Sequence, residues 1–504
     1  MANLAETIDI PCAAWTAMER RRRHIVDLLG GTLAMRDAGE QWLPREAKES
    51  VASYNARLIR SVLYGALSDT IGKLAAKPFS KPIRIVGELP ELLQPIERNA
   101  DRAGNSLHNV AQDSFRDAAS FGFSGFFVDL PDVVVSSLGD LQERSIYPAI
   151  TAVRARDVIW WKGSRDSSGM VRLGEIRIRE CDEDSDDISC GYRIRRVVSA
   201  EYGGTPTATW EIWERPKDGW VKTTFGTISH RNIPFEPWYT NQEGLLRACP
   251  PLEDLGWLNV RHWQSSSDQA NILRYARVAM PWATGITEDE ASNMSIAAAS
   301  QFLHSTAKEA RFGMLEHSGA AIESGRLDLQ DLEARMETLG LQPFIERVGN
   351  QTATGVIAGQ SGTMTIIQSW IRNEEAALRR ALILAHELMG AKNAPIDETL
   401  EVEIFSEFTV SASAKGNVEL LDKARTRGDI DQQTHLEELQ RYSILAENRD
   451  VAEIIERTKA EGPPGGAVAG NPNAFGADPS PDPSSDQGTD PATDPSITDE
   501  TQDA

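Results

Sequence analysis

The stretch Leu252–Arg277, LEDLGWLNVRHWQSSSDQANILRYAR, decides the fold, because its pattern is helical and most of its sides are polar. Prolines bound it at Pro250-Pro251 and at Pro281, as is common at helix ends. One face is shared by residues at three- and four-residue steps: Leu255, Leu258, His262 and Ser265. A helix this polar needs more than one neighbour. We therefore predict that it packs against copies of itself in a ring.

The segment that follows predicts a second helix. Residues 283–324 have a mixed pattern typical of a short α/β segment. Apolar residues then recur at helical spacing, and Gly340 ends the pattern: Leu329, Leu332, Met336 and Leu339. Arg347–Gln360 is small and polar with three glycines, which predicts a mobile loop.

The strongest helical pattern runs from Ser361 to Gly390. Its apolar stripe would extend for about 43 Å at 1.5 Å per residue, and Glu375 and Arg379 form a favourable i,i+4 pair on it. Beyond it we expect a strand and then three helices: Glu401–Val410, Asn417–Arg427, Gln432–Tyr442 and Val451–Lys459.

The part before the polar helix predicts helices followed by strands. From Ala13 to Lys77 the pattern is helical with breaks at Gly30-Gly31 and Leu43-Pro44, and one apolar face runs from Ala56 to Leu74. Ser106 caps a further helix that leads into a buried strand at Phe126–Leu130. Short runs rich in β-branched and aromatic residues then predict antiparallel strands: Val158–Trp161, Val171–Ile178, Tyr192–Val198, Thr209–Trp213 and Trp220–Phe225.

The charge of the chain argues against tight nucleic-acid binding. Its 504 residues include 52 Lys and Arg against 75 Asp and Glu, a formal net charge of −23. A protein that grips phosphates would carry a basic surplus or stripe. Residues 461–504 are acidic and rich in Pro, Gly and Ser, so we expect a disordered tail. The chain has no apolar run long enough to span a membrane and no secretion signal, so we expect a soluble, cytoplasmic protein with no membrane partner.

Motifs for catalysis or metal binding are incomplete. His386-Glu387 would need a second histidine at Gly390 to hold zinc, and Gly72-Lys73 lacks the glycine and hydroxyl of a phosphate loop. The four cysteines have neither zinc-finger nor disulfide-framework spacing. The acidic run Asp182–Asp187 could bind a divalent cation, although a solvated loop is the favoured interpretation. We expect no enzyme, no metal and no cofactor.

Several motifs in linear order resemble the portal proteins of tailed bacteriophages, over about residues 15 to 460. They are Trp42-Leu43-Pro44, Tyr54, Arg57-Leu58, Lys77-Pro78-Phe79, Asn99-Ala100-Asp101, Gly125–Pro131, Ile233-Pro234-Phe235, Pro251–Asn259, Gly428–Asp431, Leu439 and Ile444-Leu445. The resemblance implies an α+β, mainly helical portal-protein fold that forms a ring.

In the terms of that family, the chain divides into wing, stem, clip and crown regions. The implied regions are an N-terminal wing at 1–250 with a strand-rich part at 150–240, a first stem helix at 251–282, a clip at 283–324, a second stem helix at 325–340, a tunnel loop at 341–360, a long wing helix and strand at 361–413, crown helices at 414–460, and the acidic tail at 461–504.

The resemblance also implies a function in the virion. It implies a ring, usually of twelve subunits, at one capsid vertex, assembled in the host cytoplasm, through which double-stranded DNA is packaged and ejected. The implied partners are the major capsid protein, the large terminase ATPase and the head-tail adaptor. An acidic conduit would let DNA slide without being retained.

The tunnel loop is the predicted DNA-contacting site. We expect weak polar contacts to phosphates from Asn350, Gln351, Thr352 and Thr354, with Arg347 either a local clamp or an intersubunit salt-bridge partner. Two other functions stay open from the sequence: another acidic ring-forming or scaffold component of a virion, and a cytoplasmic hydrolase whose site has no recognisable motif.

Overall fold

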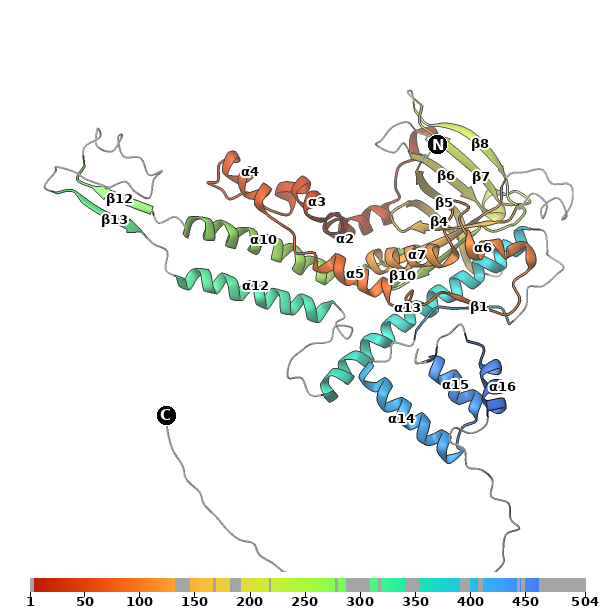
Figure 1. Ribbon diagram of the computed structural model, residues 1–504. Coiled ribbons are helices and arrows are strands. Elements are labelled where there is room, and N and C mark those ends of the chain that lie inside the picture. Colours follow the sequence, from red (N-terminus) through yellow and green to blue (C-terminus); the bar gives the residue numbers. More distant parts are fainter. Residues whose placement is uncertain are drawn as a thin grey trace, which may run out of the picture. The chain divides into compact units, whose positions relative to one another are not determined.

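The computed structural model divides the chain into two units, Met1–Phe408 and Thr409–Ala504 (Figure 1). The residues that it describes are 4–131, 146–165, 169–181, 192–216, 219–276, 280–286, 309–315, 319–340, 353–389, 399–406, 411–441, 445 and 449–461. Helices and several sheets alternate in the first unit, and the described part of the second unit is helical.

A three-stranded antiparallel sheet forms the centre of the first unit. Its middle strand β2 (Phe123–Asp129) pairs with β3 (Ala149–Arg154) and β9 (Phe235–Tyr239). Because side chains alternate along a strand, Phe126 and Val128 join the core built with helices α7 (Leu107–Phe121) and α13 (Ala353–Leu388), whereas Phe127 joins a second core with the neighbouring sheet.

A glycine makes the turn from α7 into β2 possible. Gly122 has φ 96°, which favours glycine, and a Cβ at this position would lie 2.4 Å from the carbonyl oxygen of Cys249. The buried strand predicted at Phe126–Leu130 is therefore present, and it begins directly after this turn.

The five predicted strands of the β-rich part form one antiparallel sheet in the order β4-β5-β6-β7-β8. Their bounds are β4 Val158–Arg165, β5 Val171–Cys181, β6 Tyr192–Val198, β7 Thr209–Glu214 and β8 Val221–Thr227. On one side of this sheet, Val158, Ile176 and Val197 pack with β2 and β9 residues in the second core.

The N-terminal helices differ from the prediction at one point. They are α1 Leu4–Thr7, α2 Ala13–Leu29, α3 Gly31–Ala38, α4 Val51–Arg60 and α5 Ala66–Ala76. The single apolar face expected from Ala56 to Leu74 is split, because Ser61 is extended, with its carbonyl accepting 3.1 and 2.9 Å hydrogen bonds from Arg36 of α3. A tertiary contact overrides the helical pattern there.

The polar helix of the sequence is α10 (Glu253–Ala276), and the second helix is α12 (Gly319–Leu339). Strands β12 (Met280–Thr284) and β13 (Arg311–Leu315) pair between them. Helix α12 begins before the expected boundary at 325, because Gly325 lies within the helix and packs against Gln269 of α10. The remaining elements of the first unit are short: η1 Gly39–Gln41, β1 Arg84–Val86, η2 Glu91–Leu93, α6 Pro95–Arg98, α9 Ala200–Gly203, β10 Gln242–Gly244, β11 Arg247–Ala248 and β14 Glu401–Glu403.

Helix α13 begins at Ala353, so the loop predicted over 341–360 is wrong for residues 353–360. Extending an existing helix by a residue is far cheaper than nucleating one, which explains how small residues and glycines continue the apolar helix toward its N-terminus. The strand predicted at Glu401–Val410 is described only as β14, which pairs with β1.

Three helices make up the described part of the second unit. They are α14 Ser411–Arg427, α15 Gln432–Arg441 and α16 Val451–Glu461. Asp431 caps α15, since its Oδ1 accepts a 2.7 Å hydrogen bond from the Thr434 backbone N–H. The tail after Glu461 lies outside the described residues.

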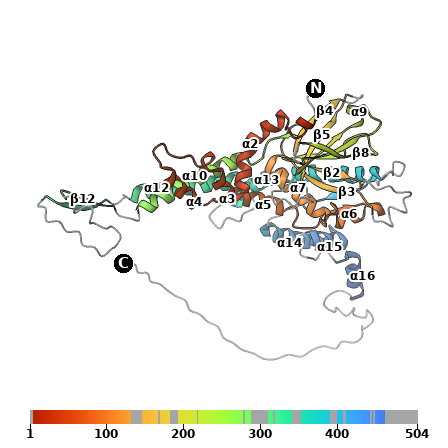
Figure 2. The same ribbon diagram turned by 90° about the horizontal axis from the view of Figure 1, so that it is seen from above.

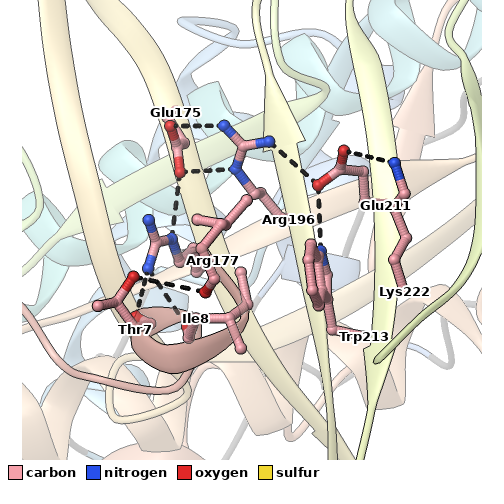
Figure 3. Close-up of polar contacts among 9 residues, drawn as sticks. Thr7, Ile8, Glu175, Arg177, Arg196, Glu211, Trp213 and Lys222 are labelled. Carbon is pink, nitrogen blue, oxygen red and sulfur yellow. Dashed lines mark hydrogen bonds and ion pairs between the residues drawn. The ribbon is translucent and has the colours of Figure 1, made fainter. Parts of the chain in front are cut away.

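A buried ion network ties the five-stranded sheet together (Figure 3). Glu175 on β5 is almost fully buried and accepts hydrogen bonds of 2.8 and 3.1 Å from Arg196 and of 3.1 Å from Arg177. Arg196 also donates a 3.0 Å hydrogen bond to Glu211 on β7. The network continues through side chains and backbone carbonyls: Trp213 and Lys222 to Glu211, and Arg177 to Thr7 and Ile8. It therefore joins four strands and the N-terminal segment.

One buried carboxyl group has no such partners. Glu374 lies in the apolar stripe of α13 between Ile371 and Ala377, is fully buried, and has no hydrogen-bond partner for either oxygen among the described residues. Burial raises the pKa of Glu374 well above its ordinary value. The side chain is therefore held in its neutral form inside the core.

Replacing Glu175 with Ala should lower the free energy of unfolding by about 3–5 kcal/mol, because Arg177 and Arg196 would lose a buried counter-charge. Urea unfolding of the full chain measures this change. The matched control is Asp69→Ala, which removes an exposed ion pair with Lys73 and should change stability by less than about 1 kcal/mol. Equal losses in both variants would contradict the role of the network.

Replacing Glu374 with Gln should make stability less dependent on pH. In the wild type, the free energy of unfolding falls by about 1.4 kcal/mol per pH unit as the pH rises from the unfolded-state pKa near 4.5 toward the raised folded-state pKa. Glutamine cannot ionise, so this fall disappears. Urea unfolding between pH 5 and 9 checks it, with Glu201→Gln on exposed α9 as the control. Parallel pH profiles for wild type and Glu374→Gln would refute the assignment.

Candidate functional site: the α10 helix layer

Helix α10 lies between two groups of helices (Figure 1). On one side it packs against antiparallel α12, and polar contacts link the pair along its length. His262 Nε2 lies 3.2 Å from Glu333 Oε1, Ser265 donates a 2.8 Å hydrogen bond to Asp328, and Gln269 donates one of 2.8 Å to the Ile322 carbonyl. Leu332 and Met336 of α12 are buried and belong to the apolar part of this side.

The opposite side of α10 faces the N-terminal helices. Asn259 is fully buried, accepts a 3.1 Å hydrogen bond from the Leu67 N–H and donates one of 2.7 Å to the Tyr64 carbonyl. Ser267 Oγ accepts a 2.8 Å hydrogen bond from the Ser61 hydroxyl, and the Arg57 guanidinium lies 3.5 Å from the Asp268 carboxylate. In the view turned by 90°, α4, α10 and α12 overlap, as expected for helices stacked along the viewing direction (Figure 2).

These contacts correct the interpretation of the polar helix. We predicted that sister copies in a ring supply the partners of its polar sides. The structure gives Asn259, His262, Ser267 and Gln269 their partners within the same chain, on α4, α5, α12 and the residues beside them. Buried polar groups need hydrogen-bond partners, and here residues of the same chain supply them. The polarity of α10 is therefore not in itself a sign of oligomerisation.

An aromatic cluster holds the N-terminal end of α10. The His24 ring of α2 stacks on Trp257 with ring centroids 4.2 Å apart, and Trp42 meets Trp257 edge-on at 5.9 Å. Gly256 permits this approach, since a Cβ there would lie 2.7 Å from His24 Nε2. Burial lowers the pKa of His24, which favours the neutral ring at neutral pH.

The chain leaves α10 into the β12–β13 hairpin before it returns as α12. The two strands pair in register from Met280 opposite Leu315 to Thr284 opposite Arg311. Within the predicted segment 283–324, residues 287–308 and 316–318 lie outside the described residues, and residues 319–324 belong to α12. The polar helix pair and its terminal hairpin are the candidate functional element.

The predicted DNA-contacting residues are not brought together in the described part of the chain. Arg347, Asn350, Gln351 and Thr352 lie outside the described residues, and the backbone of Thr354 is in the first turn of α13. The helical pattern alone did not identify Ser267 and Gln269 as residues that bind neighbouring helices. The feature that could have identified them is their position on a helix that is bounded by prolines and is polar on more sides than a single neighbouring helix could cover.

Within the described residues, no group of acidic, histidine and cysteine side chains is arranged to hold a metal ion. The acidic run Asp182–Asp187 is outside that set. No described helix combines the length and apolarity needed to cross a membrane.

A family model described as "Domain of unknown function (DUF4055)" matches residues 251–389. This range runs from the start of α10 to the end of α13, and so contains the candidate element. No curated protein matches the chain.

Solved structures that resemble the chain include components of gene transfer agent (GTA) particles. "Neck of empty GTA particle computed with C6 symmetry" matches with a TM-score of 0.44 and 8% identity, over 75% of this chain and 90% of that one. "Virion of native gene transfer agent (GTA) particle" matches with a TM-score of 0.41 and 8% identity, over 75% of this chain and 89% of that one. "Neck of native GTA particle computed with C12 symmetry" matches with a TM-score of 0.41 and 10% identity, over 80% of this chain and 97% of that one.

Replacing Asn259 with Ala should lower the free energy of unfolding by about 2–4 kcal/mol, because the Leu67 N–H and the Tyr64 carbonyl would lose their partner. Urea unfolding measures the loss. Asn55→Ala on the exposed side of α4 is the matched control, and helix propensity predicts a gain of less than about 0.7 kcal/mol there. A loss at Asn259 no larger than the change at Asn55 would show that α10 is not held in this way.

Proposed function

We propose that this protein is a structural, non-enzymatic subunit of a phage-type virion, and that it acts as the portal. In this proposal, copies of the chain form a ring at one capsid vertex, usually of twelve subunits, through which double-stranded DNA is packaged and ejected. The major capsid protein, the terminase ATPase and the head-tail adaptor would contact different regions of the ring.

The observation that carries the proposal is the α10–α12 pair with its terminal hairpin. Two long antiparallel helices, joined by polar contacts and leading into β12–β13, match the order of stem and clip that the sequence resemblance implies. The sheets before α10 would belong to the wing, and α14, α15 and α16 to the crown.

The proposed path of DNA requires weak binding. The chain has a net charge of −23, so a channel built from many copies would repel phosphates at long range. Polar contacts from Asn350, Gln351, Thr352 and Thr354 would guide the duplex without retaining it, with Arg347 as a clamp or as an intersubunit partner.

Purified full-length protein should form annular particles with a central channel. Twelve copies of 55.4 kDa give 12 × 55.4, about 665 kDa, as the expected mass. Light scattering after size exclusion and negative-stain class averages measure mass and shape. A monodisperse 55.4 kDa species at high concentration, which also forms no rings when produced beside the shell-forming partners, would overturn the proposal.

A further inference from the structure

Two surfaces with exposed apolar side chains lie on the outer sides of α4 and α12. On the side of the N-terminal helices, Leu33, Ile59 and Val62 are 72%, 67% and 64% exposed. On the other side, Leu327 of α12 is 50% exposed, and Ala334, two turns further along the same helix face, is exposed as well. We call these the α4 face (Leu33, Ile59, Val62) and the α12 face (Leu327, Ala334).

The α4 face combines exposed residues of α3, of α4 and of the segment that follows α4. The Leu63 N–H donates a 3.2 Å hydrogen bond to Thr32 Oγ1, and Arg36 binds the Ser61 carbonyl, so the residues beside Leu33 and Val62 are joined. Tyr54 and Arg57 are buried on the side of α4 that meets α10, and Ile59 lies about half a turn away from them. Ile59 therefore points away from α10.

The two faces cannot cover each other within one chain. Ser267 of α10 binds Ser61 beside α4, whereas Ser265 binds Asp328 of α12, so α10 lies between α4 and α12 at this level (Figure 1). At its other end α12 meets the N-terminal helices, where Gly340 lies beside Thr70 of α5. On α12, Leu332 and Met336 are buried toward α10, and Leu327 and Ala334 lie on the opposite side of the helix. A complementary surface must come from another molecule.

We propose that the α4 face of one copy packs on the α12 face of the next copy. This inference rests on the proposed ring and names the surfaces that close it. A heterologous contact of this kind covers both faces of every copy and repeats around a ring. A contact between two α4 faces would end at a dimer and would leave both α12 faces bare.

Charge within the faces fits this pairing. Arg60, exposed beside Ile59 at the end of α4, is basic. Asp331, exposed on α12 between Leu327 and Ala334 on the same helix face, is acidic. Packing of unlike faces would bring opposite charges to the same contact, and such complementarity fixes the register of an interface more than its affinity.

Two variants test the pairing: Ile59→Asp, which damages only the α4 face, and Leu327→Asp, which damages only the α12 face. Each alone should stay monomeric, because the damaged contact places an aspartate in an apolar interface. In a 1:1 mixture, the intact α12 face of Ile59→Asp can bind the intact α4 face of Leu327→Asp. The mixture should therefore double in mass and grow no further, as measured by light scattering.

The control is Phe225→Asp, which changes an apolar side chain that is 69% exposed on strand β8, away from both faces, and should leave ring formation unchanged. Circular dichroism verifies that each variant is folded. If an aspartate variant does not fold, the same experiment is done with Ile59→Ser and Leu327→Ser.

The outcomes separate this inference from the proposed function. Rings in the wild type that persist in both single variants would mean that other surfaces form the contact, and the proposed function would stand. Monomers in both variants and in their mixture would mean that the two faces do not bind each other. A wild type that forms no ring would remove the proposed function, and this inference with it.

Discussion

The need of buried polar groups for hydrogen-bond partners governs the arrangement around α10. Asn259 can be fully buried only because Leu67 N–H and the Tyr64 carbonyl satisfy its amide. His262 and Gln269 impose the same requirement toward α12. Where Ser267 binds Ser61 and Ser265 binds Asp328, α10 therefore lies between α4 and α12.

Buried charge is treated in two different ways in the first unit. Glu175 is surrounded by the guanidinium groups of Arg177 and Arg196, so its charge is compensated in place. Glu374 is fully buried without a hydrogen-bond partner among the described residues, and burial together with the neighbouring Glu375 raises its pKa, which favours the neutral form. The β-rich sheet is thus joined by directional ion pairs, whereas α13 buries its apolar stripe in the core with β2 and α7 and adds polar contacts such as the ion pair of Arg380 with Glu236.

Residue spacing and helix-ending prolines predicted many of the individual elements. The strands from Val158 to Phe225 and the helix α10 follow from their residue patterns, and the structure contains them. Long-range contacts limited the rest. The Arg36–Ser61 contact divides α4 from α5. Glu375 accepts a hydrogen bond from the Ile404 N–H, and Arg379 donates one to the Leu400 carbonyl, in addition to the pair predicted between them on one helix. Such contacts join distant positions and leave no periodic signal.

An electron cryomicroscopy structure of the assembled full-length protein would test the proposed contact between copies most directly. We predict that Ile59 of one copy lies in van der Waals contact with Leu327 of the partner subunit, and that α10 of each copy lies between its α4 and α12. A ring in which both faces stay in solvent, or in which α4 meets the α4 of its neighbour, would contradict it.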